Sequence, residues 1–353
     1  MGRDATLDDP MLRLEQASSQ LFAWFDLHEG PPGDAAHRAS AHLLCHAATD
    51  APGHAQAARA ALQRMLAAEL PAALGARAAL GEVCLQANEI LGDRLFLDAA
   101  LSLCEGIAHG TRLDGDDALC FSAIPVRVLP VHHANLQAAS LLARTGQRVG
   151  DGSFVDLARR AVAYSLPLQL PDGGWLHGEQ RPLRWADRFH AGSRVCSLLE
   201  LAQCDLHPGL HAALARALRQ LVDLNFDVAG VPRVAQREDE ASECELLAAA
   251  EAMGALARVA TTEPQAGRRA ARLAARLADW TSGHLQAWSL WREPASVHGP
   301  GRLLDALARV QGLGAAAWRT PEAALRAPSG IGGADAPSSR LDQSGLPAPG
   351  RLH

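Results

Sequence analysis

The chain has 353 residues, of which 48% are hydrophobic, so it is long enough to bury a sizeable core in one large domain or two small ones. Its net charge of −6 and the lack of a basic block argue against a nucleic-acid-binding surface. The sequence contains no lysine, which excludes Schiff-base, pyridoxal-lysine and P-loop-lysine chemistry.

The first residues and the cysteines bear on where the protein works. Residues 1–10 are polar and acidic and lack the apolar core of a signal peptide. No apolar run approaches the roughly 20 residues that a membrane span requires. The seven cysteines form no Cys-x-x-Cys pair and lie mostly in apolar helical stretches, which is typical of free thiols in a reducing compartment. We therefore expect a cytoplasmic protein with no membrane span and no cofactor.

Helical periodicity is nearly continuous, with apolar residues at positions i, i+3, i+4 and i+7. Many periodic segments are bounded by Gly, Pro or Asp, which cap or stop helices. In chain order, this pattern predicts helices over residues 10–26, 34–48, 53–69, 72–91, 94–109, 132–146, 152–168, 190–204, 208–225, 243–260, 263–281 and 299–318. Alternating Val, Ile and Thr are scarce, so strands are expected only locally.

The connections between these helices alternate between short and long. The long ones recur after about every second helix, at residues 110–131, 171–189, 226–242 and 282–298. A helical hairpin cannot bury both faces alone, so hairpins must stack or close into a ring, in which alternate connections fall on one end. We predict an all-α, single-domain (α/α)6-type toroid over residues 1–325 with the long loops around its mouth, and a disordered tail over residues 326–353.

Polar and aromatic side chains concentrate in one connection, residues 172–194. These twenty-three residues include two Trp, two His, three acids and four Arg, whereas the flanking segments are rich in Ala and Leu. Binding and catalytic groups concentrate on loops that a rigid scaffold holds. We therefore expect this loop to form one lip of a pocket.

The turn at residues 169–175, Gln-Leu-Pro-Asp-Gly-Gly-Trp, supports two interpretations. Asp-Gly supplies a tight turn and Trp175 a large apolar anchor, which is typical of a structural staple between hairpins of an α-toroid. Alternatively, Trp175 and Trp185 are stacking platforms for a ligand, and Arg184 and Arg194 bind its carboxylate or phosphate groups.

Asp187 and His190 lie three residues apart at the start of a predicted helix, so both side chains can face one cavity. A carboxylate beside an imidazole fixes its tautomer and raises its basicity, which suits general acid/base catalysis. Glu179 is the third acid/base candidate. The structural alternative is that Asp187 caps the helix and His190 donates to a backbone carbonyl.

His132, His133 and Asn135 form an unusual polar face at the start of another predicted helix, for ligand binding or for capping. Together with His177 and Cys120 they offer the residue types of a zinc site. Because these residues have no tight ligand spacing, we expect no metal.

Two further acidic patterns are less specific. Asp26 lies in the segment Phe-Asp-Leu-His-Glu-Gly, which is either a polar turn or part of the ligand site. Asp114-Gly-Asp-Asp117 matches the D-x-D-D motif of class II terpene cyclases, which are also α-toroids, although a solvated turn is the better interpretation. The chain is also short for that class and poor in the aromatic residues that shield carbocations.

These motifs together resemble a bacterial family of α/α-toroid proteins associated with polysaccharide biosynthesis. That family has a D-G-S-W turn and then D-N-F-H-T-G at the next helix start, and this chain has Asp172-Gly-Gly-Trp175 and Asp187-Arg-Phe-His-Ala-Gly192. Its aromatic-Asn-Ala-Asn and Asp-Gly-x-Pro-Lys segments are similar to residues 132–135 and 229–233. The matches span residues 25–310.

The chain departs from that family at Arg188 and His133, where the family has Asn, so the resemblance bears first on the ring fold. It implies a carbohydrate-active protein that acts on or binds a glycan or a glycan precursor such as a sugar nucleotide, with protein partners from a biosynthetic assembly. The alternatives are a non-catalytic binding or assembly subunit with the same fold, and isoprenoid cyclisation at Asp116 and Asp117.

Overall fold

A computed structural model describes residues 10–27, 32–236, 243–284 and 300–313. The described residues are mostly helical, as the periodicity predicts. Their helices are α1 (Pro10–Leu27), α2 (Pro32–Thr49), α3 (Pro52–Ala67), α4 (Leu74–Leu91), α5 (Arg94–Ala108), α6 (His132–Val149), α7 (Gly152–Ser165), α8 (Ala191–Gln203), α9 (Leu210–Asn225), α10 (Glu243–Thr262), α11 (Pro264–His284) and α12 (Pro300–Gln311).

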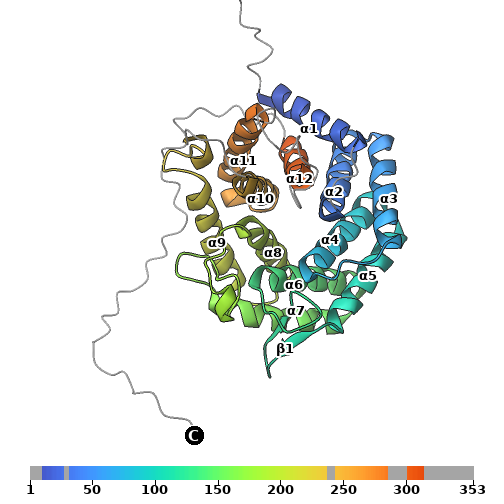
Figure 1. Cartoon of the computed structure of the whole chain (residues 1–353), viewed down its shortest axis with the longest axis vertical. Coiled ribbons are helices and arrows are strands. Elements are labelled where there is room, and N and C mark those ends of the chain that lie inside the picture. The colour runs from blue at the N-terminus through green and yellow to red at the C-terminus, as the bar shows by residue number, and fades with distance from the viewer. Residues whose placement is uncertain (1–9, 28–31, 237–242, 285–299, 314–353) are drawn as a thin grey trace, which may run out of the picture. The chain divides into compact units, whose positions relative to one another are not determined.

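The helices form two concentric rings (Figure 1). The even-numbered helices form the inner ring, in which each packs against the next and α12 packs against α2. Each odd-numbered helix from α3 to α11 lies outside and packs against the inner helix that precedes it, while α1 contacts α11 and α12. This arrangement is a closed (α/α)6 toroid, so the predicted fold class is confirmed.

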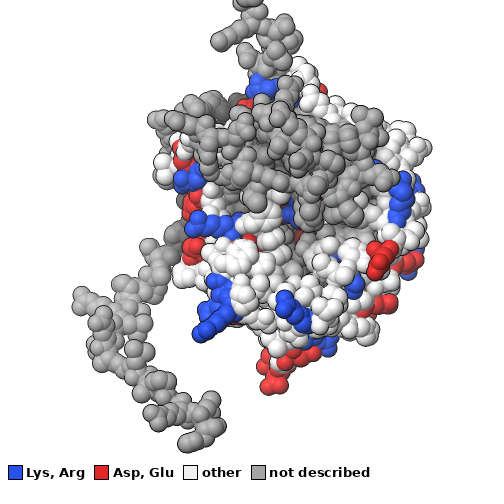
Figure 2. Space-filling model, in the orientation of Figure 1, with Lys and Arg blue, Asp and Glu red and all other residues white. Residues whose placement is uncertain are grey.

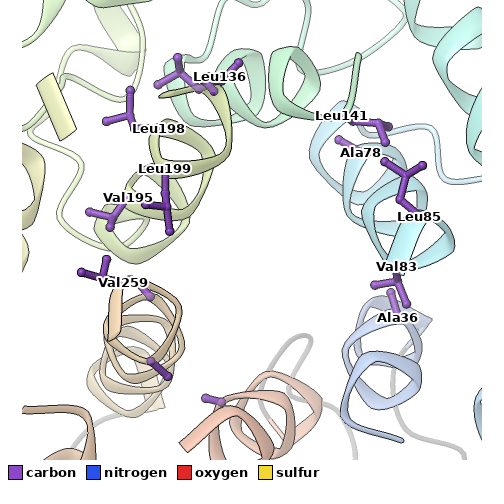
Figure 3. Packing of buried hydrophobic residues seen from close by; sticks show 14 of the residues in the cluster. Ala36, Ala78, Val83, Leu85, Leu136, Leu141, Val195, Leu198, Leu199 and Val259 are labelled. Atoms are coloured by element: carbon purple, nitrogen blue, oxygen red, sulfur yellow. The ribbon is translucent and has the colours of Figure 1, made fainter. Parts of the chain in front are cut away.

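Buried hydrophobic side chains fill the contacts between neighbouring inner helices (Figure 3). Small residues allow these helices to approach closely. A Cβ atom added to Gly192 on α8 would lie 2.4 Å from the backbone oxygen of Glu251 on α10, a distance that real Cβ atoms do not adopt. Gly192 ends the segment that resembles D-N-F-H-T-G, so this contact gives a packing reason for glycine at that position.

Two of the short connections have the same sequence and the same geometry. Gly92 and Gly150 end α4 and α6 in the left-handed region of backbone space, which glycine adopts without strain. Asp93 and Asp151 follow directly and cap α5 and α7, because each side chain accepts a hydrogen bond from the backbone N–H two residues later. A Gly-Asp pair therefore reverses the chain from an inner helix to an outer one.

The long connections all lead from an outer helix to the N-terminus of an inner helix. They cover residues 109–131, 166–190, 226–242 and 285–299. Because the helices of each hairpin run in opposite directions, the outer helices end and the inner helices begin at one end of the toroid, whereas the turns at Gly92–Asp93 and Gly150–Asp151 lie at the other. The two long loops that the structure describes in full, residues 109–131 and 166–190, therefore share one end as predicted, and we call this end the mouth.

The first of these loops contains a two-stranded antiparallel hairpin, β1 (Arg112–Asp114) and β2 (Leu119–Phe121). This local sheet agrees with the expectation of few strands. Around the periphery of the described surface, arginine and acidic side chains are interspersed (Figure 2). Among the described residues, no helix combines the length and the hydropathy that crossing a bilayer demands. The predicted domain end at residue 325 and the predicted tail lie outside the described residues.

The turn at Gly173 yields a first test of the fold. Gly173 has φ +94°, and an added Cβ would lie 2.2 Å from the backbone oxygen of Arg216 on α9. Gly92 has φ +67° but has nothing within 4 Å of an added Cβ. We expect Gly92→Ala to cost about 1 kcal/mol of unfolding free energy, from backbone strain alone. Gly173→Ala should cost about 3 kcal/mol or more, because the turn or α9 must also move.

Urea unfolding of the two variants beside the unchanged protein measures this difference. Equal costs for Gly92→Ala and Gly173→Ala would contradict the close packing of the 169–175 turn against α9.

Candidate functional site

The loop between α7 and α8 is organised by its own backbone hydrogen bonds. Gly174 N–H donates to the Asp172 carboxylate at 2.9 Å, which closes the tight turn that Asp-Gly predicts. Farther along, His177 N–H donates to the Trp185 carbonyl at 2.9 Å, and His132 N–H donates to the His177 carbonyl at 3.1 Å. The loop therefore folds back on itself and brings His177 to the N-terminus of α6.

Three imidazoles converge on the carboxylate of Asp187. The Asp187 Oδ2 atom lies 3.0 Å from Nδ1 of His190, 3.2 Å from Nδ1 of His177 and 3.5 Å from Nδ1 of His133. Asp187 itself is only 1% exposed, and the three histidines are partly exposed. We call His133, His177, Asp187 and His190 the His–Asp cluster. It joins the starts of inner helices α6 and α8 at the mouth.

The ring planes of the cluster are also ordered. The rings of His133 and His190 are stacked, with centroids 3.6 Å apart and an interplanar angle of 8°. His177 stacks on Trp185 at 4.4 Å and 12°. Each imidazole is therefore held both by its Nδ1 contact and by a face contact, so the cluster is pre-organised before any ligand binds.

The charge state of Asp187 follows from its surroundings. Burial alone would raise its pKa, but the imidazoles of His133, His177 and His190 and the charge of Arg194 outweigh burial and hold the pKa well below its usual range. Burial lowers the pKa of His133 to about 4, although Asp187 opposes the change. At neutral pH, Asp187 is thus an anion that orients imidazoles. This is the carboxylate–imidazole pairing that the sequence suggested for Asp187 and His190.

Arg194 pairs with the same carboxylate as the histidines. Its side chain is 1% exposed, its Nη1 lies 3.1 Å from Asp187 Oδ2, and its Nη2 donates to the Asp187 carbonyl. The guanidinium also lies over the ring of Trp175, 5.7 Å from its centroid. The prediction that Arg194 grips a ligand is therefore wrong, because its donors are buried against Asp187.

The two tryptophans have opposite environments. Trp175 is fully buried, and its Nε1 donates to the Ser165 carbonyl at 2.7 Å. Its predicted role as a stacking platform is wrong, since a ligand cannot reach it, and the structural staple is the correct interpretation. Trp185 is 46% exposed over His177, and the neighbouring Arg184 is exposed. Both therefore stay candidates for contact with a ligand.

The polar residues at the start of α6 have different roles. Asn135 is fully buried, and its side-chain amide donates to the Ala161 carbonyl and the Ser165 hydroxyl and accepts from Phe121 N–H. It connects α6, α7 and β2, so its predicted place in the ligand site is wrong.

His132 is also buried, with Nδ1 3.2 Å from the Ser165 hydroxyl and Nε2 3.2 Å from the carboxylate of the partly exposed Glu179. Burial lowers the pKa of His132, although Glu179 opposes the change. His132 therefore acts as a support for Glu179, and only the carboxylate of this pair is open to solvent.

Cys120 is buried, and its thiol donates to the Phe121 carbonyl. The structure does group potential metal ligands, but they are His133, His177, Asp187 and His190. Only His133 and His177 of this group belong to the zinc-type set considered from the sequence.

The remaining acidic candidates lie apart from the cluster. Asp114, Asp116 and Asp117 are exposed on the β1–β2 hairpin, and Asp114 pairs with Arg112 and Arg160. An exposed, arginine-paired hairpin is unsuited to protonating an isoprene, which needs a carboxylic acid in an apolar cavity. The side chain of Asp26 lies outside the described residues.

Sequence reasoning missed Asp34, at the start of inner helix α2. This residue is 1% exposed, and burial raises its pKa to about 6, which the backbone N–H of Gly301 and the charge of Arg302 only partly offset. An acid in the first turn of a helix is an ordinary stabilising feature. Only the packing of α12 against α2, which buries the carboxyl, makes it unusual, so no signal in the sequence distinguishes it.

Comparisons with known proteins agree on the fold. No family model matches the chain, and neither does any curated protein. The class defined by the two rings is the α/α toroid. A GH76A α-1,6-mannanase from Salegentibacter sp. HEL1_6 is 12% identical over 87% of this chain and 100% of its own, with a TM-score of 0.61.

Two other solved structures bear on the alternatives. Dfg5 from Chaetomium thermophilum, in complex with glucosamine, is 13% identical over 88% of this chain and 92% of its own, with a TM-score of 0.64. An ent-copalyl diphosphate synthase from Streptomyces platensis is 21% identical over 79% of this chain but only 50% of its own, with a TM-score of 0.52. At these identities the likeness establishes a shared toroid and no shared activity.

Proposed function

We propose that this protein is carbohydrate-active and that it binds a glycan or a glycan precursor at the mouth of the toroid. One observation carries the proposal: a buried carboxylate holds three partly exposed imidazoles, one of which stacks on an exposed tryptophan. An aromatic face suits stacking against the apolar face of a sugar ring, and imidazoles beside it can exchange protons with hydroxyl groups. The fold neighbours that act on mannan or hold glucosamine support this choice of ligand.

The proposed chemistry is proton transfer by His190 or His177. Each imidazole directs Nδ1 toward Asp187, which leaves Nε2 as the atom that can meet a substrate. An ionised carboxylate behind an imidazole fixes its tautomer and stabilises the imidazolium that forms, as in serine-protease triads. Glu179, held by His132, is the proposed second proton-transfer group.

This arrangement favours some sugar reactions over others. Most glycosidases place two carboxyl groups on either side of the scissile bond. Asp187 is buried behind imidazoles, so among the predicted acid/base residues only Glu179 offers a carboxylate to solvent. We therefore propose a reaction that moves a proton, such as epimerisation or elimination, in place of two-carboxylate hydrolysis.

The proposal also covers the pathway, the ligand and the cellular compartment. A role in polysaccharide biosynthesis follows from the family resemblance, and the exposed Arg184 suits the phosphates of a sugar nucleotide. The six described cysteines are all free, which supports a reducing compartment such as the cytoplasm.

A non-catalytic binding or assembly subunit is the second candidate. It is favoured by the burial of Asp187, since a ligand would meet imidazoles and Trp185 but not the carboxylate. Turnover distinguishes the two candidates. If the unchanged protein binds a glycan and leaves it chemically intact, the binding subunit is correct. If it converts the glycan and His190→Gln binds without conversion, the enzyme is correct.

Calorimetric titration with oligosaccharides, uronates and sugar nucleotides tests the binding site itself. We expect Trp185→Ala to weaken binding of the recognised ligand about tenfold, or about 1.4 kcal/mol, from loss of the stacking face. Leu95→Ala is the matched control, because Leu95 is 48% exposed at the start of α5, at the end of the toroid with the short turns. Equal affinities for both variants, or no binding of any carbohydrate by the unchanged protein, would contradict the proposed carbohydrate site.

A further inference from the structure

We propose that His133, His177, Asp187 and His190 together bind one divalent transition-metal ion, with zinc as the expected ion. The proposal does not rest on the carbohydrate function, because metal content is measured without any substrate. It adds a binding role to side chains that the proposed function treats as proton carriers.

The spacing of the four ligand atoms matches tetrahedral coordination. Zinc binds imidazole nitrogen and carboxylate oxygen at about 2.0–2.1 Å, which places two ligands of a tetrahedron about 3.3–3.4 Å apart. The three distances from Asp187 Oδ2 to the imidazoles are 3.0, 3.2 and 3.5 Å. All four ligand atoms lie within 4.8 Å of one another. Side-chain rotations that tilt the His133 and His190 rings out of their stack would bring these atoms to the distances and directions that a single ion requires.

The donor set has the right chemistry. Three imidazoles and one carboxylate suit zinc and its neighbours in the first transition series, whereas calcium and magnesium prefer oxygen ligands alone. In the structure, the Nδ1 atom of His133 is buried without a hydrogen-bond partner. Buried polar atoms are almost always satisfied, so this ring nitrogen, which contacts Asp187 Oδ2 only at 3.5 Å, can take a further partner. A metal ion at the centre of the cluster would supply it.

The surroundings hold the ligands in place. Metal-binding carboxylates are commonly fixed by a second hydrogen-bonding group, and Arg194 has that role for Asp187. The stack on Trp185 fixes the orientation of the His177 ring, whereas the parallel rings of His133 and His190 must tilt apart before both Nδ1 lone pairs point at one ion. Arg194 also neutralises the one carboxylate, so we expect weaker binding than at a closed structural site made of cysteine thiolates. Because the three imidazoles are partly exposed, a bound ion would be within reach of water or of a ligand oxygen.

The test uses the full chain, stripped with a chelator, dialysed into metal-free buffer and titrated with Zn²⁺ or Co²⁺. We expect one ion per chain by elemental analysis, a visible Co²⁺ spectrum of four-coordinate type, and a higher melting temperature when Zn²⁺ is present. His177→Gln and His190→Gln should each weaken Zn²⁺ binding at least about 100-fold, more than the 10–100-fold loss typical of outer-shell partners.

Two matched controls exclude adventitious binding to other histidines. His211 is exposed on α9, and His54 contacts His42 with the two Nδ1 atoms 2.8 Å apart. His211→Gln and His54→Gln should bind Zn²⁺ as the unchanged protein does. The proposal is overturned if the unchanged protein takes up no stoichiometric metal, or if binding survives in His177→Gln. It is equally overturned if binding is lost in His54→Gln. If His190→Gln fails to fold, the Co²⁺ spectrum of the unchanged protein and His177→Gln still decide.

The outcome is separable from that of the proposed function. Metal-free protein that binds a glycan would leave the carbohydrate proposal intact and remove the metal. Protein that binds one ion at the cluster but no carbohydrate would support the metal site and contradict the carbohydrate proposal.

Discussion

Asp187→Asn is expected to lower the free energy of unfolding by about 3–5 kcal/mol, the cost typical of breaking a buried ion pair from one side. The substitution keeps the shape of the side chain but removes its charge. Arg194 is 1% exposed, with Nη1 3.1 Å from Asp187 Oδ2, so its cation would lose its nearest buried counter-charge. His177 and His190 would lose their common hydrogen-bond partner at the same time.

Chemical unfolding of a double-mutant cycle measures this coupling. Arg194→Met in the Asp187→Asn background should recover part of the loss, because the unpaired cation is then gone. Asp114→Asn is the matched control. Asp114 also contacts two arginines, but it is exposed on the hairpin, so the change should cost less than about 1 kcal/mol. A cost for Asp187→Asn as small as that of Asp114→Asn would contradict the role of Asp187 as the hub of the cluster.

Trp175→Ala should destabilise the protein by a similar amount, about 3–5 kcal/mol, which is typical of truncating a buried aromatic residue. Trp175 is fully buried, with the Arg194 guanidinium over its ring, and its indole N–H donates to the Ser165 carbonyl. Trp175→Phe keeps most of the volume but leaves that carbonyl without its partner, so we expect about 1–3 kcal/mol.

Trp185→Ala is the natural comparison, because Trp185 lies in the same loop but is 46% exposed. We expect a loss near 1 kcal/mol, from its contact with His177 alone. Thermal and urea unfolding of the three variants would give the order Trp175→Ala, Trp175→Phe, Trp185→Ala from most to least destabilised. A reversed order would contradict the assignment of Trp175 as the buried structural residue and Trp185 as the exposed one.

Most of the fold could be predicted from the sequence because its signals are local. Apolar periodicity predicts residues 94–109 and 190–204 as helices, and the structure has Arg94–Ala108 and Ala191–Gln203. Loop lengths are also local, and their alternation is enough to place the long loops at one end of a ring. The boundary errors, such as three residues at the ends of α6 and α7, arise near capping positions, where helical and turn geometry differ little.

The site was predictable only in part, because burial and ring closure are not local. Trp175 and Trp185 are the same residue type in one loop, and only the packed structure separates the buried one from the exposed one. Arginine is usually solvated, so nothing in the sequence marks Arg194 as a buried partner of Asp187. His133 joins His177 and His190 only because α6 and α8 are neighbours in the inner ring.

The central claim is that a carbohydrate meets the protein at the His–Asp cluster, and histidine NMR tests it most directly. Protein labelled with ¹⁵N at histidine would be titrated with the carbohydrate that calorimetry identifies, and ring signals would be assigned with His→Gln variants. We expect the ring nitrogens of His133, His177 and His190 to shift together while those of His42 and His54 stay unchanged. Shifts confined to histidines outside the cluster, with saturable binding, would contradict the claim and place the carbohydrate elsewhere on the toroid.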